Sequence, residues 1–318
     1  MTDYIDQYKN KLSFLANGQS WVILSDIEKR IKNKIEMVGK PLKDWDINIY
    51  RGILTGCNEA FIIDKQKRDE LINKDGKSAE IIRPILRGRD IKRYGYEFAD
   101  LYLLFIPWHF PLHLDTTITG VSKDAEELFK EEYSAVYNHL MQYKNMLSAR
   151  NISETGIRYE WYALQRWGSN YWDDFSKQKI LWAETMRIHK SNIQNFPRFG
   201  FTRSEIFTDK TCFFATGTHL YFILAYLNSS LGRYLCKRYV SILDNGGYLM
   251  QKVYLEAVPI IKPEISHIQK VENLCINIID EPDSKYEYEI NKNIYSLYNF
   301  SQNEIKYIEN DNFEPLSR

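Results

Sequence analysis

Short apolar and alternating runs predict β-strands in the first two thirds of the chain. Residues 46–53 alternate and are rich in isoleucine, which is typical of a strand. Residues 55–58 predict a turn, and residues 60–63 a second strand, so that the two strands would form a hairpin. Gly52 and Gly56 leave places where another backbone could come close. Further strands are predicted at 101–107, 179–183, 212–215 and, with a connector, 249–261.

Apolar residues at helical spacing predict helices at 21–35 and 125–149 and within the helical last part, 265–310. A short polar helix is predicted at 3–16, a short charged one at 65–74, and one that begins at 219–227 and continues through 238. Ser301 and Glu304 form a capping-box pattern in the helical last part. The pattern predicts an α+β fold, with a mixed, mostly antiparallel β domain, flanking helices and a helical C-terminal part. The expected divisions are connector helices at 1–44, a β-rich domain at 45–263 and a helical segment at 264–318. The front helix either connects to something upstream or packs on its own domain.

Composition favours a folded protein and limits its partners. The chain of 318 residues is 44% hydrophobic and 14% aromatic, with 23 tyrosines, which is enough for a substantial core. The 42 basic and 42 acidic residues balance, which argues against a nonspecific nucleic-acid binder but not against a specific one. Four scattered cysteines indicate a reducing compartment, and the lack of a signal peptide or long apolar run predicts a soluble, cytoplasmic protein away from membranes.

Two stretches carry side chains suited to phosphate. The first set, at one end of the predicted hairpin, is Arg51, Thr55 and Asn58. The second is a basic strip of closely spaced residues, Arg83, Arg87, Arg89, Lys92 and Arg93. Both could place a protein on a DNA backbone. The alternatives are a hairpin that only packs and a surface strip that has no partner.

A third stretch, from residue 150 to residue 170, carries side chains suited to reading bases. Arginine pairs with guanine, and asparagine or glutamine with adenine, through two hydrogen bonds at once. The base-reading candidates are Arg150, Asn151, Arg158, Tyr159, Trp161, Gln165 and Arg166. The aromatic members would give the arginines a rigid floor. The alternative is that the aromatics are core residues and the arginines a solvated rim.

The same stretches resemble a known family. Residues 52–64 read G-I-x-T-G-x-N-x-A-F-x-I-D, and residues 81–94 read I-x-R-P-x-L-R-G-R-D-I-x-R-Y. Together they resemble the TaqI-like C-terminal specificity domain of adenine-N6 DNA methyltransferases and fused type IIG restriction-modification enzymes. The resemblance continues at 159–166, 227–230 and 258–260, so that it spans roughly residues 20–265 in order.

The resemblance implies a specificity domain that performs no chemistry alone. The chain has no Pro-Pro and no F-x-G-x-G, the elements with which the family clamps adenine and holds S-adenosylmethionine. No catalytic residue and no cofactor are therefore assigned to this chain. S-adenosylmethionine, with Mg²⁺ where the enzyme also cleaves DNA, would belong to a catalytic part outside it. The resemblance also implies that residues 45–263 form a DNA target-recognition domain. The implied partners are double-stranded DNA and an adenine methyltransferase domain, with or without an endonuclease domain, in cis or in trans.

Two other classes of function stay open from sequence. Pro282-Asp283 and Glu304-Ile305-Lys306 match the text of a Mg²⁺-dependent nuclease, although the second group lies in a helical pattern where the motif needs a strand. A protein-interaction module is compatible with the neutral charge. His109 and His113 have a metal-ligand spacing, but Pro111 between them argues against a helical metal site, and no metal is assigned.

Overall fold

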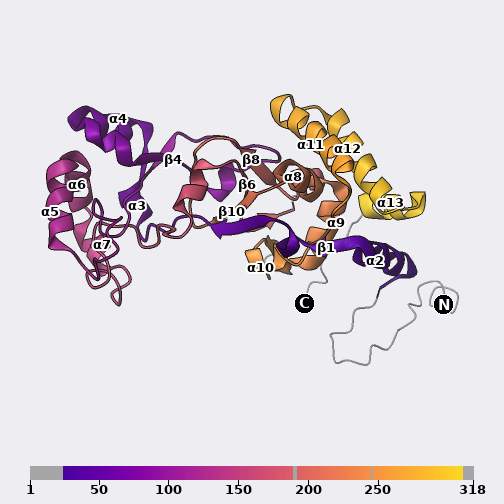
Figure 1. Ribbon diagram of the computed structural model, residues 1–318, viewed down its shortest axis with the longest axis horizontal. Coiled ribbons are helices and arrows are strands. Elements are labelled where there is room, and N and C mark those ends of the chain that lie inside the picture. Colours follow the sequence, from indigo (N-terminus) through magenta and orange to yellow (C-terminus); the bar gives the residue numbers. More distant parts are fainter. Residues whose placement is uncertain (1–23, 189–191, 245, 311–318) are drawn as a thin grey trace. The chain divides into compact units, whose positions relative to one another are not determined.

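A computed structural model describes residues 24–188, 192–244 and 246–310 (Figure 1). The predicted helix at 3–16 and Trp21, the start of the next one, lie outside the described residues. The chain forms two compact units that interleave in sequence. The sheet unit contains Ile47–Leu220 and Leu243–Lys252, and the helical unit contains Met1–Asp46, Tyr221–Ile242 and Val253–Arg318. No helix in the described ranges is long and apolar enough to cross a membrane.

The sheet unit is built on two four-stranded sheets. One has the order β2-β10-β6-β8 and is antiparallel throughout. The other has the order β3-β5-β4-β9 and is antiparallel except for the β4–β9 pair. Their strands are β2 (Ile47–Arg51), β3 (Ile62–Asp64), β4 (Ile82–Leu86), β5 (Leu101–Leu104), β6 (Lys179–Ala183), β8 (Phe199–Thr202), β9 (Phe207–Thr208) and β10 (Cys212–Gly217). A mixed, mostly antiparallel α+β fold is thus confirmed.

The predicted hairpin at 46–63 is wrong. The first strand forms as β2, but it pairs with β10, which lies about 165 residues further along the chain. The register places Arg51 opposite Phe213. Residues 60 and 61, the predicted start of the second strand, lie instead in the short helix α3 (Asn58–Phe61), and β3 after it pairs with β5. The close approach expected at Gly52 is confirmed, because a Cβ there would lie 2.0 Å from the carbonyl oxygen of Asp209. The glycine therefore lets β2 pass directly against the turn before β10.

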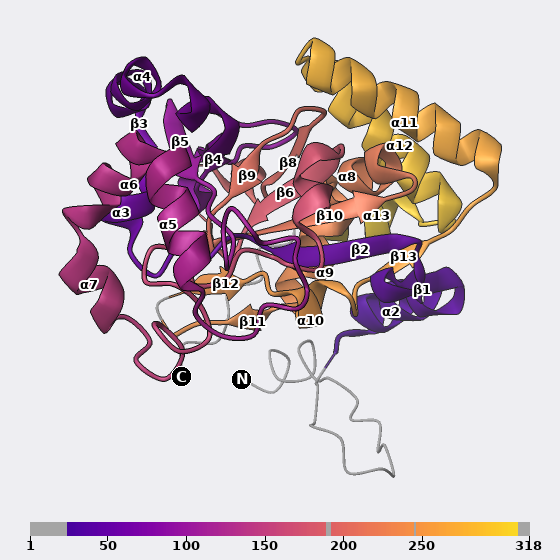
Figure 2. The ribbon, with the colours of Figure 1, turned by 60° about the vertical axis from the view of Figure 1, so that its left-hand side comes forward.

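Helices cover one end of the sheet unit. They are α4 (Lys65–Lys74), α5 (Lys123–Glu132), α6 (Ser134–Met141) and α7 (Lys144–Ala149). Two short strands of the same unit, β7 (Thr185–Arg187) and β12 (Gly247–Leu249), pair with each other. Figure 2 shows α4 and α6 beside the β3-β5-β4 sheet. The single helix predicted at 125–149 is wrong, since the backbone leaves the helical region at Tyr133 (φ −129°, ψ 49°). The Tyr133 ring packs against Phe110, with the ring centroids 5.0 Å apart.

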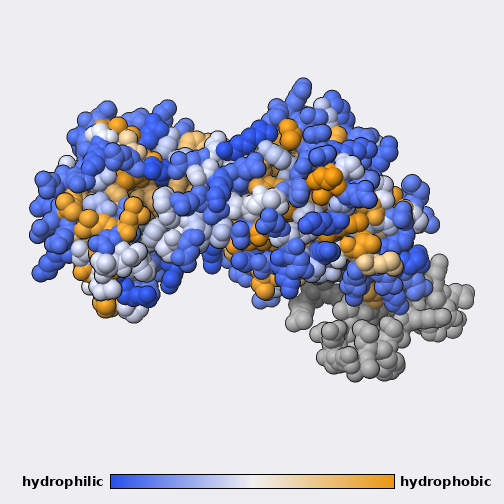
Figure 3. Space-filling model, viewed as in Figure 1, coloured by the Kyte–Doolittle hydropathy of each residue, from blue (hydrophilic) through white to orange (hydrophobic). Residues whose placement is uncertain are grey.

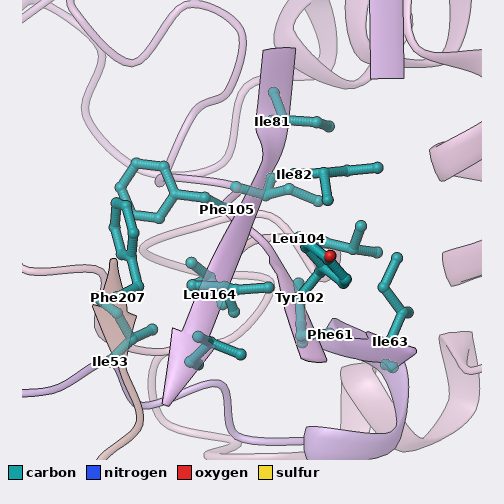
Figure 4. Packing of buried hydrophobic residues seen from close by; sticks show 14 of the residues in the cluster. Ile53, Phe61, Ile63, Ile81, Ile82, Tyr102, Leu104, Phe105, Leu164 and Phe207 are labelled. Carbon is teal, nitrogen blue, oxygen red and sulfur yellow. The ribbon is translucent and has the colours of Figure 1, made fainter. Parts of the chain in front are cut away.

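Apolar side chains from both sheets and from the loops form one core in the sheet unit. Leu104, Phe105 and Leu164 belong to it, together with Ile53 and Phe207, as Figure 4 shows. The core therefore includes residues of the segments 53–61 and 161–164, on which the predicted DNA contacts depend. These segments are anchored by packing as well as by backbone hydrogen bonds.

The helical unit combines the two ends of the described chain with a central insertion. Its elements are α2 (Asp26–Val38), β1 (Gly39–Pro41), α8 (Leu220–Asn228), α9 (Ser230–Tyr239), β11 (Ser241–Ile242), α10 (Lys252–Leu255), β13 (Pro259–Ile261), α11 (Ile265–Asp280), α12 (Ser284–Leu297) and α13 (Gln302–Glu309). β1 and β13 pair antiparallel. The helix predicted at 219–238 is two helices, because the Ser229 hydroxyl accepts a hydrogen bond from Gly232 N and starts α9. The capping box of Ser301 and Glu304 is confirmed.

Candidate nucleic-acid interface

The loop after β2 and the segment 150–166 meet in the sheet unit. Leu54 and Arg166 exchange two backbone hydrogen bonds, of 3.1 and 2.9 Å, in an antiparallel bridge. Gly56 has a φ of +77°, and a Cβ there would lie 2.7 Å from Oε1 of Gln165. Two stretches that the sequence assigns to separate tasks, phosphate contact and base reading, therefore lie side by side.

Arg150 is buried and connects the loop after β2 to the segment 150–166. Its guanidinium donates hydrogen bonds to the carbonyl oxygens of Leu147 (3.2 Å), Trp161 (2.9 Å), Thr55 and Ala163. Burial lowers the pKa of Arg150 to about 10. Because its donors are used inside the protein, Arg150 holds the two segments together and does not face a partner, contrary to the base-reading expectation.

Two aromatic candidates are also interior residues. Tyr159 is fully buried, stacks on Trp108 at 4.7 Å between ring centroids, and its hydroxyl is 2.9 Å from Oγ1 of Thr155. Trp161 is buried and donates its indole N–H to Glu126 at 2.7 Å. Neither ring is presented to a base, so these two residues fit the core alternative.

An aromatic floor for an arginine nevertheless exists. The guanidinium of Arg158 lies over the half-buried ring of Trp108, 5.7 Å from its centroid. Trp108 lies in the loop 108–119, and its ring stacks on the ring of Tyr159. A planar guanidinium on an aromatic face keeps its N–H groups directed outward in the ring plane. Arg158 is thus oriented, while its side chain stays 60% exposed.

Glu154, which the sequence did not single out, organises the remaining base-reading candidates. Its carboxylate accepts a hydrogen bond from Nη1 of Arg158 at 3.0 Å and one from Nδ2 of Asn151. It also lies 3.7 Å from Nη2 of Arg166, whose side chain is 63% exposed. One partly buried acid therefore lies beside three polar side chains of the segment 150–166. A single glutamate among arginines carries no motif, so only the folded arrangement reveals this role.

The loop that carries these residues, residues 151–159, is closed by its own backbone hydrogen bonds. Asn151 O accepts from the N–H groups of Glu154 (2.9 Å) and Thr155 (3.0 Å), and Gly156 N donates to Tyr159 O (2.9 Å). Gly156 has a φ of +75°, which favours glycine there. We call residues 151–158 the Glu154 loop. Its side chains are held by a fixed backbone, as binding loops on a rigid scaffold commonly are.

The three candidates near β2 differ in availability. Thr55 is buried, and its hydroxyl donates to Asn58 Oδ1 at 2.6 Å and accepts from Cys57 N at 3.2 Å, so it shapes the turn. Asn58 is exposed at the start of α3. Arg51 forms a two-pronged ion pair with Glu184, at 2.7 and 2.8 Å, and donates to Lys210 O at 2.9 Å. Only Asn58 of the three presents an exposed side chain without an ion pair in the described structure.

The basic strip is largely neutralised by neighbouring acids. Arg83 pairs with Glu205 at 3.2 Å, Arg87 with Asp90 at 2.9 Å and Lys92 with Glu97 at 3.1 Å. The hydrogen bond to Asp90 raises the pKa of Arg87. Burial alone would raise the pKa of Asp90, but the hydrogen bonds from Arg87 outweigh it and lower this pKa. Arg89 is exposed, and no described acid lies within ion-pair distance of it.

The residues proposed for a nuclease have structural tasks in the helical unit. Glu304 is buried, caps α13 and accepts a hydrogen bond from Lys34 at 2.8 Å. Asp283 caps α12, accepting from Lys285 N at 2.8 Å. Among the described residues, no three potential metal-ligand side chains come together. His109 bonds instead to the buried Glu160 (Nδ1 to Oε1, 3.0 Å). The nuclease alternative is not favoured.

Comparison with known proteins identifies the family. The model of the TaqI-like C-terminal specificity domain matches residues 83–260, more than half of the chain. The type II methyltransferase M.MjaIV of Methanocaldococcus jannaschii is 26% identical over 240 residues, 72% of this chain and 69% of that protein.

Two solved structures are similar as well. The type IIL restriction-modification enzyme MmeI, solved in complex with DNA, aligns over 85% of this chain and 35% of its own, with a TM-score of 0.57 and 14% identity. The type IIG restriction endonuclease BpuSI aligns over 86% of this chain and 32% of its own, with a TM-score of 0.47 and 11% identity. The chain thus spans about a third of the length of these enzymes, and its likeness to MmeI is one of fold. On the family match, which includes residues 83–94 and 159–166 of the motifs, this chain belongs to the TaqI-like C-terminal specificity domains.

Proposed function

We propose that the chain recognises one short duplex DNA sequence and thereby directs an adenine-N6 methyltransferase to it. The sheet unit would make the DNA contacts. The methyltransferase, with or without an endonuclease, would act in cis or in trans and would bind S-adenosylmethionine, and Mg²⁺ for cleavage. Acting on DNA in a prokaryotic cell, the chain would work in the cytoplasm.

The observation that carries the proposal is the arrangement of Arg158 and Arg166. Both guanidinium groups are mostly exposed, yet both are held beside one carboxylate, that of Glu154. Arginine reads guanine through two parallel hydrogen bonds, which requires a defined orientation of the guanidinium plane. Gln165 lies next to Arg166 and against Gly56, so a third candidate reader shares the same surface. Asn151 completes the set through its bond to Glu154.

Phosphate contacts would come from exposed groups on the same unit. Arg89 and Asn58 are available as they stand. Arg51, Arg83, Arg87 and Lys92 would have to exchange or share their carboxylate partners with phosphate. Neutral net charge fits a protein whose basic groups are paired until DNA arrives.

The test begins with selection of bound duplexes from a random pool at fixed salt, followed by affinity measurements on single base-pair variants of the selected site. Arg166→Ala and Arg158→Ala should each lose about 1–3 kcal/mol on the selected site and much less on altered sites. Arg30→Ala is a matched control, because its side chain is 59% exposed and also near a glutamate, but lies in the helical unit. A chain that selects no sequence, or full discrimination in both variants, contradicts the proposal. Absent or salt-insensitive DNA binding would favour a protein-interaction module.

A further inference from the structure

The Glu154 loop also exposes two large apolar side chains. Ile152 is 77% exposed and Ile157 is 61% exposed. The neighbouring turn carries the exposed Val121, whose N–H donates to Ile157 O at 3.2 Å, and the loop before it carries the exposed Leu114. Figure 3 shows orange hydrophobic residues scattered among hydrophilic ones over the part of the sheet unit that holds α5, α6 and α7. Single exposed apolar residues are ordinary, but two on one short loop, with the exposed Val121 hydrogen-bonded to that loop, favour a contact site.

The position of the two isoleucines within the loop is specific. Ile152 directly follows Asn151, and Ile157 directly precedes Arg158. Both neighbours are bonded to Glu154, so the backbone and the polar side chains of the loop are held while the isoleucines point to solvent. The loop thus offers apolar and hydrogen-bonding groups together, on a fixed backbone.

This mixture selects the kind of partner. An apolar protein surface would cover the isoleucines, but it would also remove Arg158 and Arg166 from water beside a single carboxylate, which leaves charge uncompensated. The major groove of DNA offers guanine acceptors for arginine and, one base pair away, the C5-methyl group of thymine for an apolar side chain. Duplex DNA satisfies both halves of the loop.

We propose that Ile152 and Ile157 contact thymine methyl groups and so specify A·T base pairs beside the positions read by arginine. This inference rests on the proposed function and adds a base type to it. No insertion between base pairs is involved, because the contact is made at the edge of the base.

The test removes the methyl group and the isoleucine separately and together. Wild type, Ile152→Ala and Ile157→Ala are titrated with the selected duplex and with duplexes in which one thymine at a time is replaced by deoxyuridine. Ile265→Ala is the matched control, since this isoleucine is 56% exposed at the start of α11 in the helical unit. Thermal unfolding of each variant checks the fold, which an exposed loop position should leave unchanged.

Wild type should lose affinity about fourfold when the contacted methyl is removed, the effect of exposing roughly one methyl group. The matching isoleucine variant should be weaker on the thymine duplex and insensitive to deoxyuridine at that one position. If every variant and every deoxyuridine duplex binds as wild type does, while Arg166→Ala still loses discrimination, the isoleucine contact is refuted and the proposed function stands. A different result would overturn the inference. The isoleucine variant would lose the same affinity for thymine and deoxyuridine duplexes, and 2-aminopurine fluorescence would report base unstacking with wild type alone. The isoleucine would then insert between base pairs and would not contact a methyl group. If wild type selects no sequence, the proposed function itself fails.

Discussion

Glu154 accepts a hydrogen bond of 3.0 Å from Arg158 and lies 3.7 Å from Arg166, the two arginines that we propose as base readers. The acid has two effects on a DNA partner. It orients the guanidinium groups, and it places a negative charge close to where the phosphates of the duplex would come. The first effect favours discrimination, whereas the second weakens binding to every sequence.

Glu154→Gln should separate these two effects. The amide keeps the shape but loses the charge, so affinity for unrelated duplexes should rise while the preference for the selected site falls about tenfold, the order of one well-oriented base contact. The measurement is the ratio of affinities for selected and altered duplexes at two salt concentrations. Glu205→Gln, which frees Arg83 in the same unit, is the control and should raise nonspecific affinity without lowering the ratio. An unchanged ratio in Glu154→Gln would show that the acid does not position the arginines.

Arg150 should behave as a structural residue and differ sharply from Arg166. Arg150→Ala leaves carbonyl oxygens of Thr55, Trp161 and Ala163 unpaired in the interior, at a cost of about 3 kcal/mol in the free energy of unfolding. Arg166→Ala removes an exposed side chain and should change stability by less than about 0.5 kcal/mol. Denaturant unfolding measures both. Equal stability of the two variants would contradict the structural role of the Arg150 hydrogen bonds.

The contrast between these arginines shows what the sequence could and could not predict. Both fall in one aromatic, basic segment, and nothing in their local pattern separates a buried guanidinium from an exposed one. The difference arises from Leu54 pairing with Arg166, which folds the segment over Thr55 and places Arg150 beneath it. That contact joins residues more than a hundred positions apart, so no local pattern reports it.

The strands follow the same principle. Residues 179–183 and 65–74 form the predicted strand and helix within the same bounds, because each has a strong local pattern. β2 was also predicted, but its partner was not, since pairing with β10 depends on the whole fold. Local patterns therefore predicted elements and fold class, whereas partners and burial required the assembled sheets.

Acid should selectively weaken the anchor between Glu304 and Lys34 in the helical unit. Burial raises the pKa of Glu304, but hydrogen bonds from Lys34 and Ser301 outweigh it, so the pKa lies below its ordinary value. A carboxylate with a depressed pKa in the folded state stabilises the protein above its unfolded pKa, and this stability is lost as the pH falls through the folded pKa.

Glu304→Gln should therefore be less stable than wild type by about 1–3 kcal/mol at pH 7, and the difference should shrink below about pH 4. Urea unfolding across this pH range measures it. Glu36→Gln, in an exposed ion pair with Lys32, should differ from wild type by no more than a few tenths of a kcal/mol. A difference for Glu304→Gln that stays constant with pH would contradict the assignment.

The chain alone should not bind S-adenosylmethionine. It lacks the Gly-rich and Pro-Pro elements that its relatives would use for the cofactor and the adenine. Titration calorimetry should give no heat beyond dilution, with or without the selected duplex. Micromolar binding would show that this chain contacts the cofactor. It would contradict the proposal that S-adenosylmethionine binds to the methyltransferase.

Arg87 and Arg89 are neighbours in the basic strip, but the structure predicts opposite consequences for losing them. Arg87 pairs with the buried Asp90 through two nitrogen atoms, at 3.0 and 2.9 Å, so Arg87→Ala leaves a carboxylate without its main partner and should cost about 1–3 kcal/mol in stability. Arg89 is exposed and pairs with no described acid. If it contacts a phosphate, Arg89→Ala should weaken binding to all duplexes alike and lower the slope of log affinity against log salt by about 0.9.

The salt titration should therefore single out Arg89. If both arginines contact phosphates, a double variant of Arg87 and Arg89 should lower the slope by about one to two. If Asp90 retains Arg87 in the complex, the double variant should lower the slope no more than Arg89→Ala does. Discrimination between selected and altered duplexes should persist in both, because phosphate contacts position the protein without reading the sequence. Arg30→Ala, on the helical unit, should leave the slope unchanged. An unchanged slope in Arg89→Ala would remove the basic strip from the interface and leave phosphate contact to Asn58 and the residues near β2.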